Sequence, residues 1–286
     1  MAWNWKRLLL LSALCWAGFV VVLVVAYWLP AAAWADGWAV QGFFSLQRPW
    51  LDDIAFRVAT LADPAPFAVW TVLLVAFALY RRQLRRAVAV IVLLVGANVI
   101  AQGLKVALHH DRWHEFLRDD WQLGAASYPS GHATASMALA FAAVVVAPAA
   151  WRRAVAIAGA IFALAVSESI MLLAWHFPSD VVGGFLVATA CALATVAALQ
   201  VADERWPQRT GRQAARRAIS GIDLRHDGAV VAGLVVAVLA GVVMAAGARA
   251  VHFADHHTTA VIAAVAVAAM AAALPVSIAA LGARRP

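Results

Sequence analysis

The chain has 286 residues, of which 65% are hydrophobic and only 13% are charged. This apolar share exceeds that of soluble globular domains and indicates an all-α protein that crosses a membrane several times. The formal net charge is +7, but most arginines flank apolar stretches, as membrane topology signals do. This placement argues against a nucleic-acid partner.

Eight apolar stretches predict membrane-spanning helices, because a run of about 18 or more apolar residues can cross the hydrocarbon layer. The segment between the first two scatters Trp and Phe among a few charges and is predicted to lie at the membrane interface. The predicted spans are residues 8–29, 64–80, 87–104, 130–150, 154–175, 180–201, 229–248 and 260–282.

The distribution of basic residues predicts the orientation of the chain. With a cytoplasmic N-terminus, most of the 22 Lys and Arg residues fall on the cytoplasmic side, as the positive-inside rule requires. An even number of spans then places both termini in the cytoplasm. We expect a multi-pass protein of the cell membrane with a transmembrane domain over 1–201, a basic cytoplasmic linker over 202–228 and a two-helix transmembrane hairpin over 229–286. The small residues of the hairpin permit close helix packing but indicate no particular oligomeric state.

Three polar stretches interrupt the apolar sequence, and the predicted topology brings all three to the extracytoplasmic side. The third span ends at Lys105 and Arg112, the fourth begins at the sequence PSGH, residues 129–132, and the fifth ends before His176 and Asp180. Because successive spans alternate in direction, these stretches share one face of the membrane. We expect a functional site there.

The residues of this face suit the binding of a phosphate group. Lys105 supplies a point charge, and the planar fork of Arg112 can hold two oxygens. Ser130 and Gly131 lead into a helix, whose free N–H groups and dipole favour an anion. Glycine at this position lets the backbone approach the phosphate closely.

The histidines suit transfer of the phosphoryl group. His132 can donate a proton to a leaving alkoxide. Asp180 can accept the second ring proton of His176, which fixes the tautomer and makes the free ring nitrogen a better nucleophile. The three catalytic candidates are therefore His132, His176 and Asp180.

The three stretches resemble the motifs of the type 2 phosphatidic acid phosphatase (PAP2) superfamily, which are Lys-x6-Arg-Pro, Pro-Ser-Gly-His and Ser-Arg-x5-His-x3-Asp. The first motif is matched except that Trp113 stands in place of the proline, and the second is matched throughout. The third is matched by Ser169, His176 and Asp180, whereas Ile170 stands in place of the arginine. The resemblance covers roughly residues 64–201.

The resemblance implies a six-helix PAP2-like core, to which the final two spans are an addition. It implies a metal-independent phosphatase in which His176 attacks phosphorus to form a phosphohistidine and His132 protonates the leaving group. The phosphate oxygens would be held by Lys105, Arg112, Ser130 and Gly131. In membrane members of the family the substrate is an anionic lipid phosphate or diphosphate, such as phosphatidate, phosphatidylglycerol phosphate or a polyprenyl diphosphate.

The isoleucine in the third motif leaves two alternatives open, because it cannot donate a hydrogen bond to a phosphate oxygen. One is a lipid phosphotransferase, and the other is a non-catalytic lipid-phosphate binder or transporter. Substitute donors could come from His109, His110, His114 or Arg118. Glu168, inside the fifth predicted span, and Ser169 are interpreted as parts of a modified pocket, since a carboxylate within the membrane usually faces a partner or cavity.

A metal site is a further alternative. The stretch HHDRWH, residues 109–114, and the histidines 252, 256 and 257 include ligand types, but they lack the spacing of a structural site. No metal and no other cofactor are expected.

Overall fold

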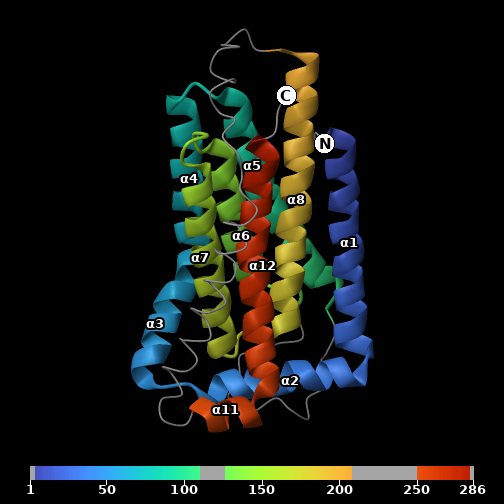
Figure 1. Ribbon diagram of the computed structural model, residues 1–286, viewed down its shortest axis with the longest axis vertical. Helices are drawn as coiled ribbons and strands as arrows, with labels where there is room; N and C mark the ends of the chain where they lie inside the picture. The colour runs from blue at the N-terminus through green and yellow to red at the C-terminus, as the bar shows by residue number, and fades with distance from the viewer. Residues whose placement is uncertain (1–3, 110–125, 208–249, 284–286) are drawn as a thin grey trace.

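The computed structural model describes residues 4–109, 126–207 and 250–283, and every element in these ranges is a helix. The long helices lie side by side in a bundle (Figure 1). One end of the bundle carries the start of α1 and the end of α8, and the other end carries α2 and α11. The elements are α1 (Trp5–Trp28), α2 (Pro30–Ser45), α3 (Pro49–Ala59), η1 (Thr60–Ala62), α4 (Pro64–Tyr80), α5 (Leu84–Ala107), α6 (Gly131–Val146), α7 (Arg152–Leu172), α8 (Pro178–Arg205), α11 (Ala250–His256) and α12 (Thr258–Ala283).

Helices α1, α5, α7, α8 and α12 are each long and apolar enough to cross a membrane. Helix α3 with η1, followed by α4, passes the same test as one span that is bent by 52°. The prediction of an all-α, multi-pass membrane protein is therefore confirmed, with five or six candidate spans in the described part of the chain. The predicted seventh span, 229–248, lies outside the described residues.

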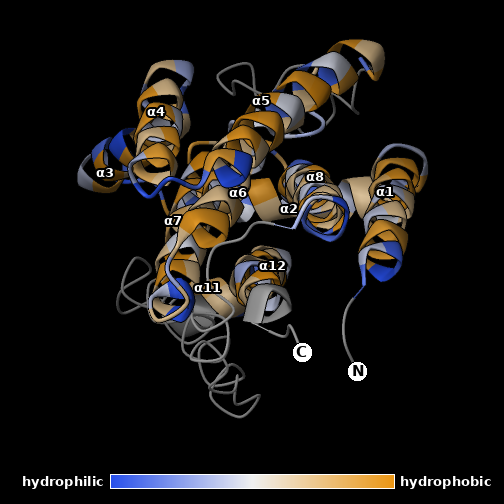
Figure 2. Cartoon of the chain, turned by 90° about the horizontal axis from the view of Figure 1, so that it is seen from above, coloured by the Kyte–Doolittle hydropathy of each residue, from blue (hydrophilic) through white to orange (hydrophobic). Residues whose placement is uncertain are grey.

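Helix α6 is shorter than predicted and lies in the middle of the bundle. Its 16 residues extend about 24 Å, whereas the hydrocarbon layer is about 30 Å thick. The predicted span of 130–150 was wrong at its C-terminal end because Pro148 disfavours helical backbone at Ala147, which is extended at ψ 140°. Seen from above, α6 lies among α5, α7 and α8 (Figure 2), and most of its side chains are buried.

Small residues allow the central helices to pack closely. A Cβ atom at Gly159 of α7 would lie 2.7 Å from the Cβ of Ala140 on α6. Within a membrane the hydrophobic effect does not drive helices together, so close contact between their backbones stabilises the pair instead. Helices α6 and α7 therefore hold each other in a fixed register.

Helix α2 runs across the end of the bundle (Figure 1), which is the placement expected of an interfacial segment. Asp36 of α2 accepts hydrogen bonds from the backbone N–H of Ser179, at 3.2 Å, and from its hydroxyl. Beyond the end of α2, Gln47 Nε2 donates to the carbonyl of Leu172 at 2.7 Å. The segment is thus attached to both sides of the α7–α8 connection.

The last helix, α12, packs against α2, α6, α7 and α8. Its N-terminal turn meets α2 closely, since a Cβ atom at Gly42 would lie 2.5 Å from the Cβ of Ala260. The predicted division into three domains stays a prediction, because most of the linker and the seventh span lie outside the described residues.

Candidate active site

Three polar segments come together at the end of the bundle that carries α2. They are the last turn of α5, the start of α6, and the connection between α7 and α8. The backbone N–H of Ser130 donates to the carbonyl of Asp180 at 2.9 Å. This bond joins the PSGH segment directly to the segment that carries His176.

His176 lies in a short connection whose two ends are fixed by the backbone. Helix α7 ends in a Schellman motif, in which Trp175 N–H donates to the carbonyl of Ile170 at 2.9 Å and Ala174 N–H to that of Met171 at 3.0 Å. Ala174 adopts the left-handed conformation that this motif requires, with φ 53°. The chain then turns at His176 and enters α8.

Asp180 orients His176 and also caps α8. Its Oδ2 atom accepts the N–H of Phe177 at 3.0 Å and lies 3.3 Å from Nδ1 of His176. Its Oδ1 atom accepts the hydroxyl of Ser127 at 3.4 Å, and the residue is completely buried. A carboxylate at Nδ1 favours the tautomer that leaves the lone pair on Nε2.

Burial lowers the pKa of His176 below its ordinary value of 6.5, and this effect outweighs the opposing hydrogen bond and charge of Asp180. The imidazole is therefore neutral at neutral pH. A buried, oriented and neutral imidazole has the properties of a nucleophile.

His132 stands opposite, in the first turn of α6. The centroids of its ring and the His176 ring are 6.4 Å apart, and the ring of Trp175 lies 5.7 Å from the His132 ring. Because a reacting group lies about 3 Å from each catalytic atom, this separation allows one tetrahedral group to contact both histidines.

Asp63, which sequence reasoning missed, is the partner of His132. Its Oδ1 atom lies 2.9 Å from Nε2 of His132. Asp63 occupies the N-cap position of α4, yet its side chain makes no capping hydrogen bond there. An aspartate before Pro64 looks like an ordinary cap in the sequence, so no local signal indicated its contact with a residue 69 positions away.

The start of α6 has the predicted form of an anion site. Ser130 is the N-cap and accepts the N–H of Ala133 at 3.3 Å, and Gly131 opens the helix. A Cβ atom at Gly184 of α8 would lie 2.7 Å from the carbonyl of Ser130. Glycine at position 184 therefore lets α8 support the backbone of this segment.

Gln102 is a second residue that sequence reasoning missed. A Cβ atom at Gly131 would lie 3.0 Å from its Nε2 atom, so the amide faces the start of α6. Lys105 lies three residues later on the same face of α5 and interacts electrostatically with Asp180 and His176. The sequence did contain a signal for Gln102, because it is a polar residue one turn before Lys105 in an otherwise apolar helix.

The remaining predicted residues are not all brought to this site. Ile170 is completely buried within the hydrophobic core, and Ser169 is also buried.

Glu168 lies in α7, where its Oε1 atom is buried and has no hydrogen-bond partner in the described part of the chain. Its inclusion in the pocket stays a prediction. Arg112, His110, His114 and Arg118 lie outside the described residues, and His109 is exposed at the end of α5.

The region that contains these segments is similar to known proteins. Residues 86–204 match the PAP2 superfamily, which spans α5 to α8 and so includes the three polar segments. Among solved structures, the chain is similar to a transmembrane PAP2 type phosphatidylglycerolphosphate phosphatase from Bacillus subtilis. The TM-score is 0.56, the sequences are 19% identical, and the match covers 70% of this chain and 98% of that one. The curated proteins contain no match. Residues 86–204 are therefore similar to the PAP2 superfamily, in a chain that has the fold of a transmembrane PAP2 phosphatase.

Proposed function

We propose that the protein is an integral-membrane lipid phosphatase that hydrolyses a phosphomonoester or diphosphate through a phosphohistidine intermediate. The observation that carries the proposal is the pair of histidine rings, 6.4 Å apart, each beside its own carboxylate. They face each other where the N-terminus of α6 can hold an anion.

The first half-reaction forms the intermediate. Nε2 of His176 attacks phosphorus while Nδ1–H stays bonded to Asp180. The bond from phosphorus to the lipid oxygen breaks, and the oxygen leaves with the electron pair. His132 donates a proton to this oxygen, so the lipid of a phosphomonoester departs as an alcohol. With a diphosphate, the oxygen that leaves is the one between the two phosphorus atoms, and the lipid departs as a monophosphate.

The second half-reaction restores the enzyme. His132, now neutral, takes a proton from water, and the resulting hydroxide attacks the phosphohistidine. The P–N bond breaks and its electron pair returns to Nε2 of His176. Inorganic phosphate leaves, and both histidines regain their starting protonation.

The remaining groups stabilise the phosphoryl charge. Lys105, the backbone N–H groups at Ser130 and Gly131, and Arg112 would hold the oxygens. Since Ile170 is part of the core, we assign Gln102 as an additional donor. Asp63 is a positioning residue, because it acts on the substrate through His132. The reaction requires no metal ion.

The predicted orientation places this site on the extracytoplasmic side, within reach of lipid headgroups. The substrate class of the proposal is an anionic lipid phosphate, such as phosphatidate, phosphatidylglycerol phosphate or a polyprenyl diphosphate. The similar protein from Bacillus subtilis is a phosphatidylglycerolphosphate phosphatase, which supports this class.

Phosphate release from these three lipids by the purified protein, with and without chelator, tests the proposal. We expect His176→Ala to lower the rate by about a thousandfold or more, since removal of a nucleophile disables the whole catalytic unit. His256→Ala, at an exposed histidine of α11, is the control and should retain activity.

Two results would contradict the proposal. Binding of the lipids without phosphate release by the wild-type protein would indicate a binder or transporter. Consumption of the lipid phosphate with transfer to an acceptor, and no inorganic phosphate, would indicate a phosphotransferase.

A further inference from the structure

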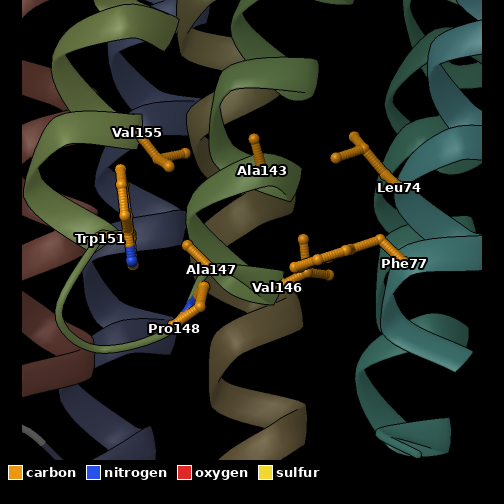
Figure 3. A pocket seen from close by; sticks show the side chains of 8 residues that line it. All are labelled: Leu74, Phe77, Ala143, Val146, Ala147, Pro148, Trp151 and Val155. Atoms are coloured by element: carbon orange, nitrogen blue, oxygen red, sulfur yellow. The ribbon is translucent and has the colours of Figure 1, made fainter. Parts of the chain in front are cut away.

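An apolar groove lies at the end of the bundle opposite the candidate site. It has a volume of about 350 Å³ and is bounded by α4, α6 and α7 (Figure 3). Its lining contains no acidic or basic side chain and consists of Leu74, Phe77, Ala143, Val146, Ala147, Pro148, Trp151 and Val155.

The groove results from the early end of α6. Because α6 stops at Val146 before Pro148, its last turn forms the floor, where the small side chains of Ala143 and Ala147 leave space (Figure 3). Helix α4 contributes one wall, and the start of α7 contributes the other with Trp151 and Val155. The hollow therefore opens between α4 and the start of α7.

A cation is fixed at the edge of this groove. The Arg81 guanidinium carbon lies 5.7 Å from the ring centroid of Phe77, and Nη1 donates to the carbonyl of Val146 at 3.5 Å. Both partners line the groove. A basic group thus lies at the edge of an apolar cavity at the end of a membrane helix, where headgroup phosphates lie.

We propose that this groove binds one acyl chain of an anionic phospholipid whose phosphate contacts Arg81. The apolar lining matches the chain, and the guanidinium matches the phosphate in charge and in its two-oxygen geometry. The groove lies at the end of the bundle that is predicted to face the cytoplasm, where anionic lipids attract basic residues. This lipid is a bound component, separate from the substrate at the opposite end.

Native mass spectrometry of the detergent-purified protein, titrated with phosphatidylglycerol or phosphatidylcholine, tests the proposal. We expect the wild-type protein to retain phosphatidylglycerol preferentially. Arg81→Gln should lower the affinity for phosphatidylglycerol about fivefold, the contribution of one basic residue near an anionic headgroup. It should lower phosphatidylcholine binding less, because the choline cation offsets the charge of the phosphate. Ala143→Phe should fill the groove and remove both lipids.

Arg57→Gln is the matched control, because Arg57 is an exposed arginine of α3 that pairs with Asp53. Equal retention of the two lipids by the wild-type protein would overturn the proposal, as would equal losses in Arg57→Gln and Arg81→Gln. If Ala143→Phe fails to fold, the affinity of Arg81→Gln for phosphatidylglycerol still tests the proposal. None of these readouts depends on phosphate release, so a failed phosphatase assay leaves the lipid test intact.

Discussion

Asp63 shows how one side chain links a helix start to the proposed chemistry. An N-cap aspartate ordinarily accepts a backbone N–H of its own helix, but this carboxylate lies against His132 instead. It fixes the direction in which the imidazole presents its proton. The same pattern of carboxylate and imidazole recurs at Asp180 and His176.

Asp63→Asn should lower kcat for a lipid phosphate about tenfold or more, because part of the general-acid contribution depends on orientation of the ring. The loss should be much smaller for an aryl phosphate such as p-nitrophenyl phosphate, whose leaving group needs no proton. Asp53→Asn, at the exposed aspartate paired with Arg57, is the control. Equal losses with both substrates would contradict the positioning role.

The buried imidazole of His176 also makes stability depend on pH. Its pKa is lowered from 6.5 in the folded protein, so below pH 6.5 the unfolded chain binds a proton more readily than the folded one. The stabilising contribution is present at higher pH and is lost as pH falls. We expect the thermal unfolding temperature of the wild-type protein to fall more steeply below pH 6.5 than that of His176→Gln. Parallel curves would contradict this account.

Ala174 adopts a backbone conformation that favours glycine, with φ 53°. Ala174→Gly should therefore stabilise the protein by about 0.5–1 kcal/mol, raising the unfolding temperature. Ala154→Gly, at an exposed position within α7, is the matched control and should destabilise by about 1 kcal/mol. A decrease in both variants would show that position 174 is not strained.

At the scale of elements, the contact of α2 with α12 depends on one glycine. A Cβ atom at Gly42 would lie 2.5 Å from the Cβ of Ala260, whereas one at Gly96 would meet nothing within 4 Å. Helix α2 also holds the start of α8 through Asp36 and Ser179. Displacement of α2 would therefore disturb the connection that contains His176.

Gly42→Ala should destabilise the protein by about 1–3 kcal/mol, as overpacking does, and should lower phosphate release. Gly96→Ala should stabilise it by about 0.5–1 kcal/mol through helix propensity alone and leave activity unchanged. Unfolding temperature and initial rate, measured in the same detergent, check both. Identical behaviour of the two variants would show that α2 tolerates a shift.

Much of the fold could be predicted because apolar runs of membrane length are a strong local signal. The predicted second span, 64–80, coincides with α4. The end of α6 was missed because Pro148 lies inside a continuous apolar run, where hydropathy gives no sign of a turn. In the site, the motif residues were predicted, whereas Asp63 and Gln102 were not. Their roles depend on contacts between helices, which spacing along one chain does not contain.

For the whole molecule, the positive-inside pattern predicts that the candidate site lies outside the cytoplasm. His109, exposed at the site end of α5, and Arg82, exposed in the α4–α5 turn, lie at opposite ends of the bundle. In a background in which Cys15 and Cys191 are replaced, His109→Cys should react with a membrane-impermeant maleimide in intact cells. Arg82→Cys should react only after lysis. The reverse pattern would invert the proposed topology.

The hydrogen bond between the Ser130 amide and the Asp180 carbonyl, 2.9 Å long, bears on the timing of turnover. It holds together the helix start that would receive the oxyanion and the loop that would carry the attacking nitrogen. This bond would keep the two segments together before a substrate arrives. A lipid phosphate would then meet segments that are already assembled, so no rearrangement between these two would delay the first covalent step.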